Sequence, residues 1–424
     1  MNNAESNIRR YFQLAVITLA AGAIFPLLYL RQNFEVPILE TFGLTLTQLG
    51  ECYSALGFIF VATFLPSGWL ADRVSTRGLM SFSLLLAGLL GLYFMTIPSF
   101  THVQLIFAGW GIATGLTFWG ALIKSVAVIA HHDEQGRFFG ILDSGRGLVE
   151  AILASIAIAW FAWSMDSLGN DTEIALQQVI LIYSVVMLVL CPVIYFVLDA
   201  QLGDEADPED LPAAESSAFS KSDMRLVFGN KKLWMASFCL LCGYQLFWAT
   251  YSFSGYLQNF FGMTAVTAGV ITVAKLWMRP IGGVVAGFVG DRYGIENILG
   301  WLMLLSSIAL VGMTIMPVGI AMTGLLVIVL TVGLLTYAIK GLYLATLDDC
   351  GVPDRIKGLA VGLMSFVGFA PDFYLPLLNG YLVDGFEGRT GYTLYFGFIS
   401  VMGVLGALAA WKLQRMHKNE KNNA

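Results

Sequence analysis

The sequence predicts an all-α membrane protein of twelve transmembrane helices, arranged as two pseudo-symmetric six-helix bundles with both termini in the cytoplasm. Three observations predict this fold: an apolar composition, a series of long apolar segments, and a repeat that relates the two halves of the chain. Of the 424 residues, 57% are hydrophobic and only 12% are charged, whereas a soluble domain carries about 25% charged residues. The composition therefore excludes an ordinary soluble protein.

Each apolar segment has roughly the 20 residues that a helix needs to cross a bilayer. The twelve segments fall at 11–41, 47–71, 79–97, 103–130, 138–164, 174–198, 233–260, 265–290, 298–316, 320–347, 359–384 and 391–413. An acidic segment rich in Pro, Ala and Ser, at 199–231, separates the sixth from the seventh. We interpret it as a disordered linker between an N-terminal bundle at 1–198 and a C-terminal bundle at 232–424.

The N-terminal segment NIRRYFQLAVITLAAGA has some features of a secretion signal. Its apolar run from Tyr11 to Leu30 is too long for such a signal and further spans follow, so we interpret it as an uncleaved first helix. Most of the 23 Lys and Arg residues lie in connecting segments on the same side as the N-terminus, and Arg389 lies on the other. The positive-inside rule then places both termini in the cytoplasm and predicts a multi-pass protein of the bacterial inner membrane.

A shift of 219 residues aligns the start of the second apolar segment with the start of the eighth. The matched pairs are Phe42/Phe261, Gly43/Gly262, Thr45/Thr264, Gly50/Gly269, Gly68/Gly287, Asp72/Asp291 and Arg73/Arg292. A shift of 222 residues matches the fifth segment with the eleventh and pairs Glu150 with Asp372. Two six-helix halves related in this way are typical of membrane transporters.

The segment GWLADRVSTRG, at 68–78, resembles the G-x-L-A-D-R-x-G-x-R/K loop of the major facilitator superfamily, and GFVGDRYG, at 287–294, resembles its second copy. The first departs from the pattern at Ser75, and the second has Glu296 where the pattern has a basic residue. The resemblance covers the whole chain. It implies a V-shaped fold of two bundles that rock to give alternating access.

Charged residues of these two loops are predicted to control opening. An aspartate at a helix end interacts favourably with the N-terminus of a neighbouring helix, while arginines beside it hold the cytoplasmic faces together. We therefore assign gating to Asp72, Arg73, Arg77, Asp291 and Arg292. The alternative is that these arginines only set the topology.

Six basic and four acidic residues lie within the predicted spans, where charges usually pair or line a water-filled pathway. They are Arg31, Lys124, Arg146, Lys275, Arg279 and Lys340, against Glu35, Asp143, Glu150 and Asp372. We assign all six bases to substrate binding, because an excess of buried positive charge favours an anionic ligand. The competing interpretation is neutralisation across helices, for example of Lys275 or Arg279 by Asp372.

Arg146 has Asp143 three residues before it and Glu150 four residues after it, so local pairing and substrate contact both stay open. Lys275 and Arg279 have no acidic residue within a turn on their own helix. Because the 219-residue shift matches them with Leu56 and Phe60, the repeat itself does not require charge at these two positions.

Arg279 is followed by Pro280, which weakens the helical ladder. An RPxxG sequence at this place in the eighth span resembles proton-coupled monocarboxylate and oxalate-type carriers, which implies that Arg279 holds a carboxylate. A planar guanidinium suits a carboxylate, phosphate or sulfonate, because it donates two parallel hydrogen bonds.

A second resemblance concerns the first span. RQNFEVPILETFGLTLTQLG, at 31–50, resembles the corresponding segment of organophosphate:phosphate antiporters, and NKKLWMASF, at 230–238, resembles the opening of their seventh helix. This implies that Arg31 binds phosphate. The partner arginine expected on the seventh helix is missing from YQLFWATYS, at 244–252. The stretch at 122–147 also resembles bacterial permeases near this branch, one of them associated with sulfosugar breakdown.

The chain has no G-x-x-x-x-G-K-[ST] loop, so ATP is not expected to be the direct energy source. Glu35, Glu150 and Asp372 are candidate proton carriers, or serve only as counter-ions. Tyr244 and Trp248 are candidates for stacking on the substrate, although aromatic residues in spans more often serve packing. No cofactor, metal site, catalytic set or nucleic-acid partner is predicted, and we expect a monomer in the lipid bilayer.

Together these observations predict a secondary active transporter, not an enzyme. It would move a small organic anion (a carboxylate, sugar acid, sulfonate or sugar phosphate) by alternating access, coupled to protons. Two alternatives stay open: exchange of an organophosphate for phosphate, and a non-transporting nutrient sensor.

Overall fold

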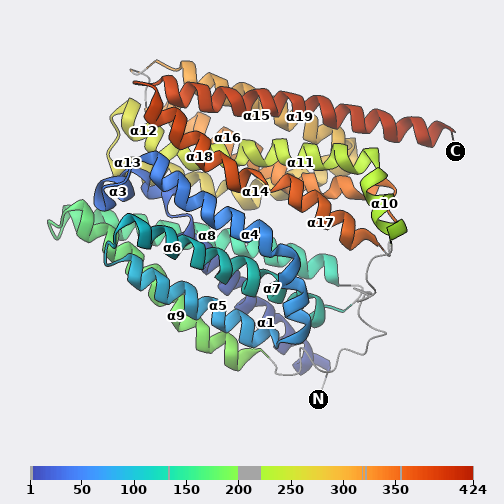
Figure 1. Ribbon diagram of the computed structural model, residues 1–424, viewed down its shortest axis with the longest axis horizontal. Helices are drawn as coiled ribbons and strands as arrows, with labels where there is room; N and C mark the ends of the chain where they lie inside the picture. Colours follow the sequence, from blue (N-terminus) through green and yellow to red (C-terminus); the bar gives the residue numbers. More distant parts are fainter. Residues whose placement is uncertain are drawn as a thin grey trace.

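Two bundles of helices lie side by side in the computed structural model, one formed by each half of the chain (Figure 1). The structure describes residues 3–131, 134–198, 221–317, 319, 322–353 and 356–423. In Figure 1 the helices run roughly from left to right, and both ends of the chain lie at the right. We call this side the terminal end of the molecule and the opposite side the distal end.

The N-terminal bundle contains the helices up to α9. They are α1 (Asn3–Ala23), α2 (Phe25–Leu28), α3 (Arg31–Phe42), α4 (Leu46–Arg73), α5 (Thr76–Phe94), α6 (Phe100–Gly111), the π-helical η1 (Ile112–Phe118), α7 (Trp119–Ile129), α8 (Gln135–Asp166) and α9 (Thr172–Val197). Helices α1 to α3 form one bent span, and α6, η1 and α7 form another.

The C-terminal bundle begins after a short helix, α10 (Lys221–Gly229). Its elements are α11 (Lys231–Ala249), the 3-10 turn η2 (Thr250–Ser252), α12 (Phe253–Phe261), α13 (Ala265–Leu276), α14 (Met278–Tyr293), α15 (Ile295–Ile315), α16 (Met322–Leu342), the 3-10 segment η3 (Tyr343–Cys350), α17 (Lys357–Gly368), α18 (Pro371–Gly385) and α19 (Thr390–Asn423).

Eleven helical stretches in the described part of the chain are long and apolar enough to cross a membrane. A twelfth, α4, passes as a pair of helices bent by 58° between Phe64 and Pro66. The predicted all-α fold of twelve spans is therefore confirmed. The expected linker lies at 199–231, of which 199–220 falls outside the described residues. Its last part was predicted wrongly, because residues 221–229 form the helix α10.

The repeat is visible in the backbone where each half turns into its second span. Helices α3 and α12 both end at a left-handed glycine, Gly43 with φ 60° and Gly262 with φ 62°. Helices α4 and α13 then begin at Thr45 and Thr264, whose side chains accept a hydrogen bond from the N–H three residues on. The two halves thus use the same cap geometry at positions 219 residues apart.

Helix breaks interrupt the first, seventh and eighth spans, in addition to the bend in α4 and the break between α17 and α18. Phe34 departs from helical geometry inside α3, with φ −131° and ψ 36°. The seventh span contains η2, and the eighth breaks at Trp277, just before Pro280. Irregular backbone at membrane depth is tolerated where protein or a water-filled cavity surrounds it, so these breaks mark the centre of the molecule as a candidate site.

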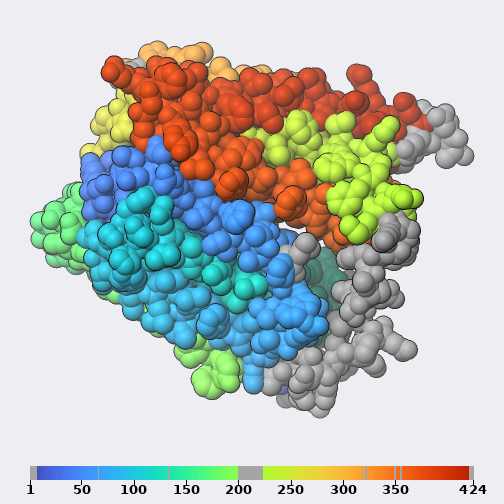
Figure 2. Space-filling view, in the orientation of Figure 1, coloured from blue at the N-terminus to red at the C-terminus, as the bar shows by residue number. Residues whose placement is uncertain are grey.

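The bundles touch along a seam formed by α4 and α18, whose surfaces meet in Figure 2. Toward the distal end the contact is close: the backbone of Gly50 lies against Pro376, and that of Gly380 lies against Thr47. Toward the terminal end, a cavity of about 350 Å³ lies between α4, α10, α11 and α17. The bundles are thus closed together distally and separated toward the terminal end.

Candidate functional site

Arg279 joins the two bundles. It is only 8% exposed, and its guanidinium donates from Nη1 to Glu150 Oε2 at 2.5 Å and from Nη2 to Asp143 Oδ1 at 3.1 Å. Both carboxylates belong to α8 of the opposite bundle. Gly147 makes the approach possible, because a Cβ atom there would lie 2.6 Å from Arg279 Cδ.

The sequence suggested that Arg279 is neutralised by an acid on another helix, and this is confirmed. The suggested partner, Asp372, is wrong, because the partners are Glu150 and Asp143 on α8. The sequence also suggested that Arg146 pairs with acids on its own helix, but this pairing is weak. Its Nε lies 3.9 Å from Glu150 Oε1, and its guanidinium lies over the rings of Phe25 and Trp119 at 5.3 and 5.7 Å. Asp143 and Glu150, which lie on the same helix as Arg146, bind Arg279 instead.

Two lysines lie near this pair. Lys275 is fully buried, and its Nζ donates to Thr250 Oγ1 at 3.0 Å. Gly333 makes room for the stem of Lys275. Lys340 Nζ lies 4.1 Å from the ring centroid of Phe247. Within the described part of the chain, neither ammonium group forms an ion pair with a carboxylate.

Four cations thus surround two carboxylates. Lys340 interacts electrostatically with Arg279, Arg146, Glu150 and Asp143, and Lys275 interacts with Glu150 and Lys340. Arg146, Lys275, Arg279 and Lys340 thus face Asp143 and Glu150, so there are two more bases than carboxylates, and among the described residues the two lysines form no ion pair. We call these six residues the cationic site.

Asp372, the repeat counterpart of Glu150, has different surroundings. It is 3% exposed, and its Oδ1 accepts hydrogen bonds from Tyr244 Oη at 2.8 Å and Trp248 Nε1 at 2.5 Å. Both donors belong to α11. The two aromatic residues selected for substrate stacking therefore hold a buried carboxylate.

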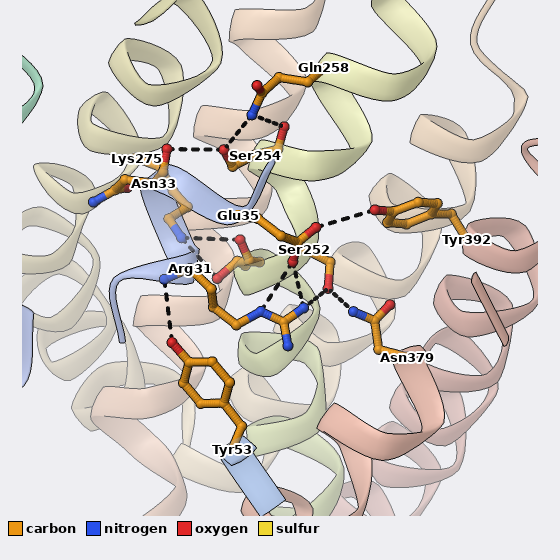
Figure 3. A network of polar contacts seen from close by, with 11 residues as sticks. Arg31, Asn33, Glu35, Tyr53, Ser252, Ser254, Gln258, Lys275, Asn379 and Tyr392 are labelled. Atoms are coloured by element: carbon orange, nitrogen blue, oxygen red, sulfur yellow. Dashed lines mark hydrogen bonds and ion pairs between the residues drawn. The ribbon is translucent and has the colours of Figure 1, made fainter. Parts of the chain in front are cut away.

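Arg31 lies at the distal side of the site in a network that crosses the seam (Figure 3). Its Nη2 donates to Glu35 Oε2 at 2.5 Å and also contacts Ser252 Oγ of the other bundle at 3.4 Å. Glu35 Oε1 in turn accepts from Tyr392 Oη at 3.2 Å. Asn379 donates to the same Ser252 oxygen at 2.8 Å. Arg31 already has a carboxylate partner, which weakens the phosphate role that resemblance implies for it.

Lys124 lies away from the cationic site, at the terminal end. Its Nζ donates to Ala71 O at 2.9 Å and to Asp72 Oδ1 at 3.2 Å. It therefore contacts the loop of its own bundle that is predicted to control opening, and it lies apart from the other five bases assigned to substrate.

The remaining gating residues also stay within their own halves. The guanidinium of Arg73 lies 3.9 Å from the ring centroid of Trp69, and that of Arg77 lies 4.9 Å from Tyr195. Arg292 stacks on its neighbour Tyr293, and Asp291 is exposed. In the described part of the chain, these contacts all stay within one bundle, as expected where the two halves are apart.

Sequence reasoning missed the glycines that face the charged side chains. Gly147, Gly255 and Gly333 lie against Arg279, Glu35 and Lys275 respectively, each from a neighbouring span. It also missed a polar cavity of about 40 Å³ at the seam, whose walls include Tyr29, Gln32, Asn33, Glu150 and Tyr251. A glycine in a span is the available signal, but the sequence does not tell which side chain it faces.

A profile of the Major Facilitator Superfamily matches residues 11–371. The chain belongs to this superfamily. It is therefore a membrane transporter by family, with a small-molecule substrate and the lipid bilayer as its surroundings. The superfamily is usually non-enzymatic, in keeping with the absence of a predicted catalytic set.

Several relatives of this superfamily member match it over most of its length. The inner membrane proteins YihN and YqcE of Escherichia coli are 27% and 29% identical, and each alignment covers 92% of this chain and 91% of the relative. A D-galactonate transporter from the same species is 24% identical over 91% of this chain and 92% of its own. The protein is accordingly an integral, multi-pass protein of the inner membrane.

Solved structures of transporters share the fold. A bacterial homologue of the human lysosomal transporter Spinster, in an inward-facing and unoccupied conformation, superposes with a TM-score of 0.74 at 15% identity, over 97% of this chain and 98% of that one. At this identity the likeness shows the fold alone.

Proposed function

We propose that the protein is a secondary active transporter that moves a small organic anion by alternating access, coupled to protons. The observation that carries the proposal is the cationic site, in which four bases from both bundles surround two carboxylates. Buried charge without a partner is costly, and a bound anion would remove that cost. The D-galactonate transporter among the relatives is named for a carboxylate, which fits this charge.

Arg279 is the proposed anchor for the anion. Its two N–H edges can each bind one oxygen of a carboxylate, sulfonate or phosphate, and they now bind Glu150 and Asp143. A substrate that enters between the bundles would compete with these two carboxylates. Lys275, Lys340 and Arg146 would add positive charge around it.

Proton coupling follows from this competition. A buried carboxylate that loses its cation is more stable in its protonated, neutral form. Glu150 would therefore accept a proton when the substrate anion takes Arg279, and it would release the proton when the substrate leaves. The anion and the proton would then travel in the same direction.

Alternating access is supported by the shape of the seam. The distal end is closed by α4 against α18 and by the Arg31 network, while the larger cavity lies toward the terminal end. Rocking the bundles would close the terminal end and separate Arg31 and Glu35 from Ser252 and Tyr392. Because one chain supplies both bundles and the complete cationic site, we propose that it works as a monomer.

Transport in proteoliposomes tests the proposal. Gluconate, glycerol phosphate and hydroxyethanesulfonate are added outside vesicles that carry a pH-sensitive dye, with glucose as the neutral control. We expect one or more anions to drive proton entry and glucose to drive none. Movement of glucose without any of the anions would contradict the anion proposal.

Two further vesicle experiments separate the alternatives. An organophosphate:phosphate exchanger would move glycerol phosphate only into vesicles preloaded with phosphate, whereas a symporter needs no internal phosphate. A sensor would be stabilised by an anion in a thermal unfolding assay and yet show no flux in either kind of vesicle.

A further inference from the structure

We propose that Asp372 and the aromatic rings beside it form a subsite for the hydroxyl groups of the substrate, next to the cationic site. The substrate would then be a polyhydroxylated anion, with its charged group at Arg279 and its hydroxyl groups at Asp372. This inference rests on the proposed function, because it adds a second part to the same substrate site.

Four aromatic side chains meet at the seam, two from each bundle. Tyr29 and Tyr53 come from the N-terminal bundle, and Trp248 and Tyr251 come from the C-terminal bundle. Ring centroids lie 4.8 Å apart for Trp248 and Tyr251, 5.4 Å for Tyr29 and Tyr251, and 6.3 Å for Tyr29 and Trp248. We call these four rings the aromatic box. Such side chains offer a large apolar face together with a polar tip, which suits a carbon chain that carries hydroxyl groups.

Asp372 supplies a hydrogen-bond acceptor at the edge of the box. Its two donors, Tyr244 and Trp248, both bind Oδ1. In the part of the chain that the structure describes, Oδ2 accepts no hydrogen bond and no base forms an ion pair with this carboxylate, although Lys340 interacts with it electrostatically. Asp372 is 3% exposed, so its carboxylate has lost most of its hydration and carries a desolvation penalty. A substrate hydroxyl that donates to Oδ2 would remove this penalty.

The box is continuous with the cationic site. Lys275 Nζ lies 5.9 Å from the ring centroid of Tyr251. Arg146 lies over Phe25, whose ring centroid is 6.4 Å from that of Tyr29. One substrate of a few carbon atoms could therefore reach both groups.

The polar cavity of about 40 Å³ borders both the aromatic box, through Tyr29 and Tyr251, and the cationic site, through Glu150. Asn33 also lines it and is 7% exposed, and its buried Oδ1 has no hydrogen-bond partner. This atom is a second acceptor that a substrate hydroxyl could reach. The cavity is too small for a six-carbon molecule, so binding requires the rings to separate.

Rocking of the bundles would separate them, because each side of the box belongs to a different bundle. Packing of the two bundles alone would not require polar groups in the aromatic box or a carboxylate beside it. An apolar seam of Leu and Phe would avoid the desolvation of three phenols, one indole N–H and one carboxylate. The combination of amphipathic rings and a few convergent polar groups is instead typical of small-molecule sites.

Three ligands test the subsite on the purified full-length protein by titration calorimetry. Gluconate has a carboxylate and five hydroxyl groups, hexanoate has the carboxylate alone, and sorbitol has hydroxyl groups alone. We expect gluconate to bind at least tenfold more tightly than hexanoate, which corresponds to one or more hydrogen bonds. Sorbitol should bind weakly, because it lacks the group that Arg279 would hold.

Variants of the proposed subsite show which residues cause the preference for gluconate over hexanoate. We expect Asp372→Asn to weaken gluconate about 10- to 100-fold while hexanoate changes little, and Tyr244→Phe to act in the same direction with a smaller effect. Asp384→Asn is the matched control, because Asp384 lies at the distal end of the same helix and binds the backbone N–H of Thr47. Trp248→Phe removes the other donor to Oδ1 and should act like Tyr244→Phe. Its control is Trp110→Phe, because the Trp110 indole donates to a backbone carbonyl inside the N-terminal bundle.

The outcomes separate the two proposals. Equal binding of gluconate and hexanoate, or an equal loss of both in Asp372→Asn, would overturn the subsite and leave the anion proposal intact. Binding of sorbitol in preference to both anions would overturn the anion proposal and support the subsite. If Asp372→Asn fails to fold, the gluconate-to-hexanoate ratio of Tyr244→Phe decides in its place.

Discussion

Arg31 and Arg279 are both buried at the seam between the bundles and both bind carboxylates, but these carboxylates come from different places. Glu35 lies one turn from Arg31 on the same helix, whereas Glu150 and Asp143 approach Arg279 from the opposite bundle. The links that Arg31 and Glu35 make across the seam are to hydroxyl groups, those of Ser252 and Tyr392.

If the bundles rock as proposed, this difference would decide how each arginine behaves. Arg31 keeps its counter-ion in any arrangement of the two halves and loses only neutral hydrogen bonds. Arg279 loses its charge partners as soon as the seam opens at its level. A substrate anion could replace those partners at Arg279, whereas at Arg31 it would have to compete with a carboxylate that never leaves. The comparison therefore supports the proposal that Arg279 binds substrate and that Arg31 contributes to distal closure.

The largest expected effect is that of Arg279→Ala. Removal of one partner from a buried ion pair costs about 3–5 kcal/mol, and the substrate loses its bidentate donor as well. We expect proton-coupled uptake in proteoliposomes to fall at least about 100-fold, with a smaller loss for Arg279→Lys, which keeps the charge.

Arg389→Ala is the control for that experiment. Arg389 is also partly buried, but it binds Tyr256 and two backbone carbonyls at the distal end. The substitution Arg389→Ala should lower the thermal stability of the protein and leave its affinity for the anion unchanged. Normal uptake by Arg279→Ala would show that Arg279 does not hold the anion.

Replacement of both partners by apolar residues sharpens the comparison. Exchange of a whole buried ion pair for hydrophobic residues is often neutral or stabilising, by about 1–4 kcal/mol. We expect Arg31→Met with Glu35→Leu to fold and to retain anion binding in the calorimeter. The equivalent pair, Arg279→Met with Glu150→Leu, should fold and bind no anion. If the first double variant also lost binding, Arg31 would belong to the substrate site.

Accessibility of introduced cysteines tests which end is closed. The five native cysteines are first replaced by serine. Ala62 lines the larger cavity, and Ser254 is fully buried at the distal side, where it bonds to Asn33 O. We expect Ala62→Cys to react with a membrane-impermeant maleimide about tenfold or more faster than Ser254→Cys, since the reagent needs the exposed thiolate. The reverse order would show that the distal end is the open one.

The smallest expected effect is a pH dependence at the terminal end, where α8 follows Glu134. The hydrogen bond from Arg10 lowers the pKa of Glu134, and the charges of Arg10 and Arg137 act in the same direction against the opposing effect of burial. Because its folded-state pKa is lowered, Glu134 stabilises the fold above the ordinary glutamate pKa of about 4.3, and this contribution is lost as the pH falls through the lowered value.

Glu134→Gln should therefore lower the unfolding temperature by about 1–2 °C at pH 7, and the difference should vanish as the pH is lowered toward 3. Thermal unfolding of both proteins across this range measures it. A difference that persists at pH 3 would show that the side chain acts through something other than its charge.

The sequence determined the fold class and much of the chemistry. Hydropathy gave the spans, and the matched pairs such as Gly43/Gly262 and Thr45/Thr264 gave the repeat that the backbone confirms. The unusual position of Arg279 before Pro280 was also visible, because a cation in a span without an acid nearby on its helix is rare. These features are local or periodic, so they can be read from one chain.

Only the tertiary structure decided which charges meet. Arg279 finds its acids 129 and 136 residues away, Lys124 goes to the gating loop, and Asp372 is held by an indole and a phenol instead of by a lysine. The physical reason is that ion pairing depends on distance and burial, and these are set by the way in which helices far apart in sequence pack. The amino-acid pattern determines that such charges must be balanced, and the packing of the two bundles determines by what.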